Sequence, residues 1–171
     1  MDFPLPFLEN MGGALYFYFI ETSDVLSETY AANHQVSALT LKEGAQMSAG
    51  YATPGSLSLK ADPVESEQGT YFPTEVKGFF PRPPASLVAE FFNMVNRKYI
   101  VLLRDGNNKT RMAGTLEQPL RFSFSEDTGS RAQDNPGAAF RFTGNINHPP
   151  YFYTPSLSFP TLTEPDGGQE A

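Results

Sequence analysis

The chain has 171 residues, of which 40% are hydrophobic, and a formal net charge of −7. This length favours one domain that buries about 70% of its unfolded surface. The absence of cysteine excludes disulfides, thiol chemistry and cysteine-ligated zinc. The overall acidity argues against tight binding to nucleic acid, which normally needs a basic face.

Residues 1–10 are predicted to form an N-terminal arm outside the domain. Pro4 and Pro6 exclude a regular helix or a central strand, and large apolar residues alternate with them. Such a segment exposes too much apolar surface to remain free, so we expect it to dock on its own domain or on a neighbour. The side chains of this arm that we expect to act in assembly are Phe3, Leu5, Phe7 and Leu8.

The N-terminus has neither the basic nor the apolar region of a secretory signal, and its longest apolar run, 14–20, is too short to cross a bilayer. We therefore expect a soluble protein that is not exported and has no membrane partner.

The first half of the chain is predicted to be mostly strand. Residues 14–20 are aromatic-rich and apolar on both faces, which is typical of a central strand or one covered at an interface. Pro73 indicates an edge position or a bulge. Further strands are expected at residues 36–41, 46–51, 56–61 and 70–80, and polar loops at 21–35 and 62–69.

One helix is predicted, close to residues 84–96. Pro84 suits a first helical position, and Arg97 and Lys98 follow where a helix C-terminus favours cations. The apolar stripe at helical spacing consists of Leu87, Val88, Phe91, Phe92 and Val95.

The second half predicts the centre of the sheet. Residues 99–103 and 110–116 are expected to form a hairpin around a Gly/Asn loop. Residues 119–125 and 140–144 then alternate phenylalanine with polar residues, which predicts two antiparallel strands with one buried face. The buried side chains expected there are Phe122, Phe124, Phe140 and Phe142.

These elements together predict a mainly β fold: an antiparallel β-sandwich or barrel with one flanking α-helix and extended terminal arms. The domain is expected to span residues 11–153. Residues 154–171 are rich in Pro, Ser, Thr and Gly and are expected to be a second arm or a disordered tail. The assembly residues predicted at this end are Tyr151, Phe152, Tyr153 and Phe159.

Residue patterns for catalysis are weak. His34 and His148 have no triad or metal-ligand spacing, and phosphate-binding and serine-hydrolase motifs are absent from the sequence. Carboxylates in an acidic loop such as 62–69 are usually solvated, and they form a cation site less often. Arg121 and Arg141 share one side of adjacent strands. They could bind a phosphate there, but we expect them rather to pair with acidic side chains or to line an interface. We expect no enzyme activity, cofactor or metal.

Charge is unevenly distributed along the chain. Residues 1–96 carry eleven acids and four bases, or −7, whereas residues 97–153 carry five acids and eight bases, or +3. Residues 154–171 add three acids. This distribution is either ordinary surface variation or the complementarity of acidic and basic surfaces that face each other between copies.

Several short motifs in residues 11–153 resemble structural proteins of tailed bacteriophages and prophages, in particular tail-tube-like proteins. The first is a glycine turn before an aromatic strand, and the others lie at strand starts and ends. They are Met11-Gly12-Gly13, Gln68-Gly69-Thr70-Tyr71, Tyr99-Ile100-Val101-Leu102, Arg111-Met112-Ala113-Gly114-Thr115, Pro119-Leu120-Arg121-Phe122, Thr128-Gly129 and Pro150-Tyr151-Phe152-Tyr153.

This resemblance implies a virion protein of the tail, assembled in the host cytoplasm as hexameric rings that stack into a tube. The partners would be copies of the chain and other tail proteins, with DNA passing through the lumen without specific binding. An acidic lumen, over which DNA slides, agrees with the net charge. Two alternatives remain: a tail terminator or head–tail connector ring, and a non-viral β-sandwich module that binds a ligand such as a glycan.

Overall fold

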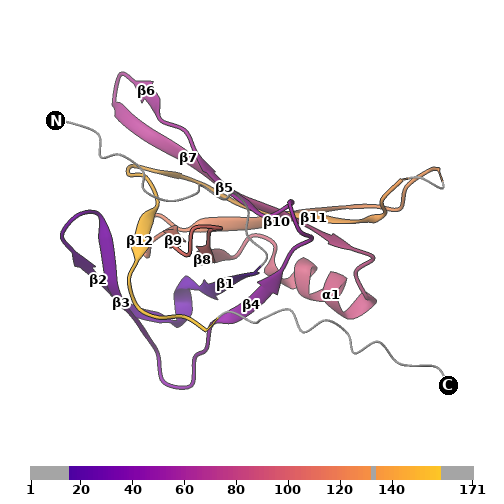
Figure 1. Cartoon of the computed structure of the whole chain (residues 1–171), viewed down its shortest axis with the longest axis horizontal. Helices are drawn as coiled ribbons and strands as arrows, with labels where there is room; N and C mark the ends of the chain where they lie inside the picture. The colour runs from indigo at the N-terminus through magenta and orange to yellow at the C-terminus, as the bar shows by residue number, and fades with distance from the viewer. Residues whose placement is uncertain (1–15, 132–133, 159–171) are drawn as a thin grey trace.

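The computed structural model describes residues 16–131 and 134–158. In chain order, its strands and helices are β1 (Tyr16–Glu21), the 3-10 turn η1 (Thr22–Asp24), β2 (Val25–Ala31), β3 (Gln35–Leu41), β4 (Ser48–Tyr51), β5 (Ser58–Ala61), β6 (Val64–Ser66), β7 (Gly69–Pro81), α1 (Ala85–Met94), β8 (Lys98–Arg104), β9 (Thr110–Ala113), β10 (Leu120–Asp127), β11 (Gly137–Ile146) and β12 (Tyr151–Tyr153). The predicted mainly β fold with one helix is confirmed (Figure 1).

The sheet branches at β8. One edge of β8 pairs with β1, and the opposite edge pairs first with β10 and then with β9. Tyr99 shows the branch directly, because its partners are Glu21 of β1 and Leu120 of β10. One wing therefore continues as β9–β12–β3–β2 and the other as β10–β11–β7–β5.

Glycine permits the divergence of β9 and β10. Gly114, the residue after β9, has φ of +84°, a conformation that side chains rarely adopt. A Cβ atom there would lie 3.0 Å from the carbonyl oxygen of Tyr99. A turn between Thr115 and Gln118 then leads the chain into β10, with reciprocal hydrogen bonds of 3.0 Å.

Two apolar clusters lie on opposite faces of β8. Tyr99, Val101 and Leu103 belong to the cluster that includes the phenylalanines of β10 and β11, whereas Ile100 and Leu102 belong to a second cluster under β2 and β3. All five side chains are buried. A strand covered on both faces is apolar throughout, which is why this run shows no alternation.

The predicted phenylalanine core is present. Phe122, Phe140 and Phe142 are buried, and Phe124 is partly buried against the same cluster. β10 and β11 pair in register, so that Phe122 lies opposite Phe142. Their ring centroids are 5.0 Å apart in an edge-on arrangement, which adds to the stability from burial.

The helix covers one end of the phenylalanine cluster, but its apolar stripe is narrower than predicted. Phe91 is buried against Phe122, Phe124 and Phe140. Phe92 is 74% exposed, because neighbouring helical residues point about 100° apart and only one can face the sheet. Phe92, a member of the predicted apolar stripe, therefore does not pack on the sheet, whereas Leu87 and Val95 pack against the phenylalanine cluster as Phe91 does.

Two predicted loops contain strands instead. The segment 21–35 contains η1 and β2, which pairs with β3, and the segment 62–69 contains β6, which pairs with the start of β7. Their side chains are mostly exposed, so they lack the apolar alternation that identifies a strand. Residue Pro73 lies between the pairings of β6 and β5 along one edge of β7, as an edge proline should.

The sheet is also neither closed nor wholly antiparallel. β12 pairs in parallel with β3 and antiparallel with β9. The described sheet ends at β2 on one wing and at β5 on the other, so it does not close into a barrel.

Candidate functional site

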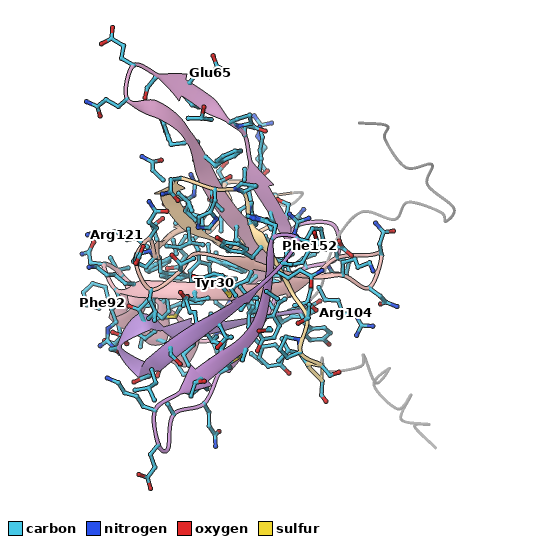
Figure 2. The ribbon with its side chains drawn as sticks, turned by 90° about the vertical axis from the view of Figure 1, so that its left-hand side faces the viewer. Tyr30, Glu65, Phe92, Arg104, Arg121 and Phe152 are labelled. Carbon is cyan, nitrogen blue, oxygen red and sulfur yellow. The ribbon has the colours of Figure 1, made fainter. Side chains whose placement is uncertain are left out.

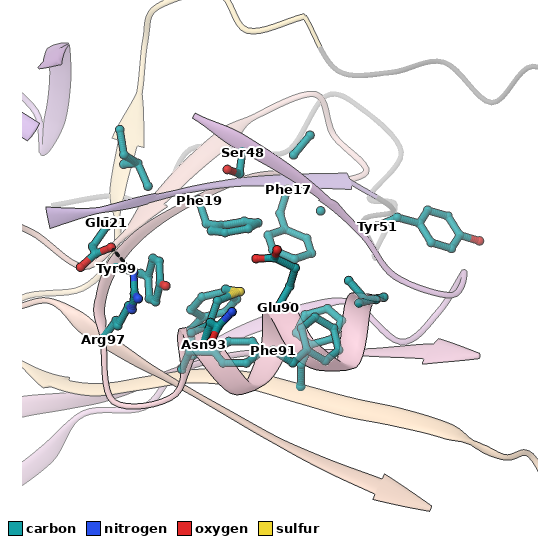
Figure 3. A pocket seen from close by; sticks show the side chains of 18 of the residues that line it. Phe17, Phe19, Glu21, Ser48, Tyr51, Glu90, Phe91, Asn93, Arg97 and Tyr99 are labelled. Atoms are coloured by element: carbon teal, nitrogen blue, oxygen red, sulfur yellow. Dashed lines mark hydrogen bonds and ion pairs between the residues drawn. The ribbon is translucent and has the colours of Figure 1, made fainter. Parts of the chain in front are cut away.

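A cleft of about 580 Å³ opens between α1 and the β1–β4 pair. Figure 3 shows Phe17 and Phe19 on its upper wall and Phe91 on its lower wall, with Tyr51 at one end and the Glu21–Arg97 pair at the other. Its volume and aromatic lining are those of sites that bind apolar groups. The phenylalanine side chains of the cluster that line it are buried, and Phe19, packed against them, is partly buried.

An ion pair lies at one end of the cleft. Arg97 donates to Glu21 over 3.2 Å, and both side chains are partly exposed, so this pair adds at most about 1 kcal/mol to stability. Burial raises the pKa of the Tyr99 hydroxyl, and the carboxylate of Glu21 raises it further. A phenol held neutral in this way donates a hydrogen bond but does not act as a base at neutral pH.

The predicted assembly residues of the C-terminal end form β12. Phe152 is 37% exposed, Tyr151 is partly buried, and Tyr153 is buried in the second apolar cluster. Tyr153, predicted to act in assembly, is instead part of the domain core, because β12 is inserted between β3 and β9. The remaining predicted assembly residues, Phe3, Leu5, Phe7, Leu8 and Phe159, lie outside the described residues.

Packing on the domain continues beyond residue 153. The backbone N–H of Thr154 donates to the carbonyl of Val36 over 3.1 Å, and Leu157 packs against the second apolar cluster. The hydroxyl of Tyr18 donates to the carbonyl of Ser158. The described start of the predicted C-terminal arm is thus bound to β1 and β3.

Arg111 attaches β12 to the sheet. Its guanidinium lies 4.1 Å from the ring centroid of Phe152 and donates to the carbonyl oxygen of Pro150 over 3.1 Å. Burial lowers the pKa of this guanidinium, which nevertheless stays charged. Its cation–π contact orients the ring of Phe152 on the surface.

The two histidines, far apart in sequence, meet at an aromatic cluster. Ring nitrogens of His34 and His148 lie 2.7 and 2.9 Å from the carbonyl oxygen of Pro149. A carbonyl only accepts, so each histidine carries an N–H at that position. Both rings pack on Tyr151, which also contacts Tyr30. The contacts join the β2–β3 turn to the segment before β12, an architectural role.

Tyr30 completes this cluster. Its hydroxyl donates to the carboxylate of Glu28 over 2.6 Å. Burial and this hydrogen bond raise the pKa of Tyr30, so the phenol stays protonated at any physiological pH. The other carboxylate oxygen of Glu28 accepts from the backbone of Leu116, which links β2 to the β9–β10 turn. Sequence spacing alone offered no signal for these long-range contacts.

Sheet edges are exposed at several places in the described chain. β2 pairs only with β3, and β4 pairs only with β1. β6 and the start of β7 form a ribbon that projects from the body (Figure 1). Leu26 on β2 is 63% exposed beside its open edge. Unpaired edges of this kind can accept a strand from another chain.

Arg121 and Arg141 lie on the outer face of the β10–β11 pair, as predicted. Arg121 is opposite Thr143, and Arg141 is opposite Ser123. Arg141 lies 3.8 Å from Glu75 of β7, so one of the two arginines has an acidic neighbour.

Within residues 16–131 and 134–158, no helix is long and apolar enough to cross a membrane, and no group of three acidic, histidine or cysteine side chains is placed to hold a metal ion. Comparison of the chain with protein-family models, with curated proteins and with solved structures found no match.

Proposed function

We propose that this chain is a structural subunit that assembles with copies of itself, as a tail tube protein of a tailed bacteriophage does. The assembly would be a stack of hexameric rings around a DNA channel, built in the host cytoplasm and carried in the virion tail. DNA would pass through the lumen without specific binding, and other tail proteins would cap the stack.

The observation that carries this proposal is the open sheet. Within residues 16–131 and 134–158, β2 and β4 each have one unpaired edge, and the β6–β7 ribbon projects from the body (Figure 1). A monomer gains nothing from such edges, which expose it to aggregation. A ring gains from them, because strands of neighbouring subunits continue the sheet and satisfy the free backbone groups.

The test is the size and shape of the purified full chain over a range of concentrations. Light scattering should detect multimers of defined mass, and negative-stain microscopy should show rings or tubes with a central channel. Single rings that never stack would favour the tail terminator or head–tail connector. A chain that remains monomeric at every concentration would contradict the whole proposal.

Deletion of residues 1–9 should weaken assembly without unfolding the domain. The segment carries four large apolar residues around Pro4 and Pro6, and it lies outside the residues that the structure describes. We expect a change in melting temperature of no more than about 2 °C, and loss of multimers by light scattering. A truncated domain that unfolds, while its folded fraction still assembles, would show that this segment belongs to the core.

A second candidate, a glycan-binding module, is favoured by the aromatic cluster of Tyr30, His34 and Tyr151 at the surface. Aromatic faces of this kind stack on sugars. In a glycan-array experiment, binding that is lost in Tyr30→Ala but kept in Phe92→Ala would support this function. An array on which the chain binds no glycan would contradict this second candidate function.

A further inference from the structure

The outer face of the β10–β11–β7–β5 wing is basic. Phe122, Phe142 and Val76 point into the core, so the residues next to them in each strand point outward. Register places Arg121, Thr143, Glu75 and Lys60 in one row, with Lys98 of β8 opposite Arg121. The next row contains Ser123, Arg141, Lys77 and Ser58.

This face has more cations than its own acids can neutralise. Glu75 lies 3.8 Å from Arg141 and 4.0 Å from Lys77, and at the far edge Lys60 pairs with Asp62 over 2.9 Å. Lys98 and Arg121 have no acidic partner among the described residues.

The side chains of Lys98 and Arg121 also face each other directly across the strands, and both are exposed. Like charges in that position destabilise a sheet. A carboxylate supplied from outside the chain would relieve this repulsion.

The β6–β7 ribbon is the acidic counterpart. It carries Glu65 and Glu67, both exposed, and residues 62–72 contain no lysine or arginine. Its tip is a hydrogen-bonded turn, in which the Ser66 hydroxyl donates to the carbonyl of Gly69 over 2.8 Å and accepts from the backbone of Gln68. Figure 2 shows Glu65 at the top of the molecule, far from Arg121, so the ribbon cannot neutralise the basic face of its own chain.

We propose that the β6–β7 ribbon of one copy docks on the basic face of the next, with Glu65 and Glu67 against Lys98 and Arg121. The two surfaces differ, so the contact is head-to-tail and builds rings or stacks rather than closed two-fold dimers. This inference rests on the proposed function and names the surfaces that would carry it.

A nucleic acid is the competing occupant of a basic face. The net charge of −7 opposes it, since the rest of the chain repels a polyanion. A second copy brings its own matched carboxylates, and the complementarity of face and ribbon within one sequence favours it.

Charge exchange tests the contact. The face variant is Lys98→Glu/Arg121→Glu, and the ribbon variant is Glu65→Lys/Glu67→Lys. Each should lower the association constant from sedimentation by about tenfold or more at low salt. The variant that combines all four substitutions presents an acidic face and a basic ribbon, so it should associate like the original chain.

Two controls isolate the effect. Lys42→Glu/Lys109→Glu changes the net charge as much as the face variant does, at exposed sites off this face, and should leave association unchanged. Melting temperatures should match across all variants, because none of the four exchanged side chains is buried.

The outcomes separate this inference from the proposed function. Multimers that persist in the face or ribbon variant, or a combined variant no better than either, would overturn the docking contact and leave self-assembly standing. A chain that is monomeric throughout would overturn both. Binding of short duplex DNA that is lost in the face variant and kept in the ribbon variant would assign this face to nucleic acid and overturn the inference.

Discussion

Replacing Phe142 with alanine should lower the free energy of unfolding by about 3–5 kcal/mol. The side chain is fully buried, and its ring contacts those of Phe17, Phe19, Tyr99, Phe122 and Phe140. Removing it leaves a cavity in the middle of the phenylalanine cluster, where five rings lose a neighbour. For a chain of this length the melting temperature should fall by roughly 6–20 °C.

Chemical denaturation monitored by circular dichroism measures this loss. Phe142→Leu keeps most of the buried volume and should cost clearly less than Phe142→Ala. If both variants unfold at the denaturant concentration of the original chain, Phe142 does not lie in a packed core.

Phe91→Ala should destabilise the fold far more than Phe92→Ala, although the two residues are neighbours. Phe91 packs on Phe122, Phe124 and Phe140, so its truncation should cost about 3–5 kcal/mol. Phe92 is 74% exposed, so Phe92→Ala should lower the free energy of unfolding by less than about 0.5 kcal/mol. Helix propensity contributes little to the difference, because the two substitutions are chemically identical.

Thermal melting of the two variants decides the orientation of α1. Equal destabilisation would mean that the helix is rotated so that both rings are partly covered. The exposed ring of Phe92 also provides a functional readout: if Phe92→Ala reduces multimer formation without changing stability, this face of α1 contributes to the assembly interface.

The parts of the fold with regular apolar spacing could be predicted. The aliphatic run of β8 predicted a strand that returns as β9, and the alternating phenylalanines of β10 and β11 predicted one buried face. In each case the order of apolar and polar residues within one segment is enough to predict which of its side chains are buried. The same holds for α1, although adjacent residues Phe91 and Phe92 left its rotation open by one position.

β2 and β6 could not be predicted from their own residues. Most of their side chains are exposed, and they are strands because β3 and β7 offer hydrogen-bonding partners. The insertion of β12 between β3 and β9 likewise depends on partners more than 35 residues away. Pairing over such distances is set by the arrangement of the whole sheet.

The candidate surfaces divide in the same way. The sequence by itself determined that the chain is mainly β, that Arg121 and Arg141 share a face, and that acids and bases are segregated along its length, because alternation and composition are local properties. Only the tertiary structure decided that Lys98 lies opposite Arg121, that Glu65 and Glu67 project on a ribbon, and that His34 meets His148. Those juxtapositions arise from the branching of the sheet at β8 and from strand register, and both depend on contacts between segments far apart in the chain.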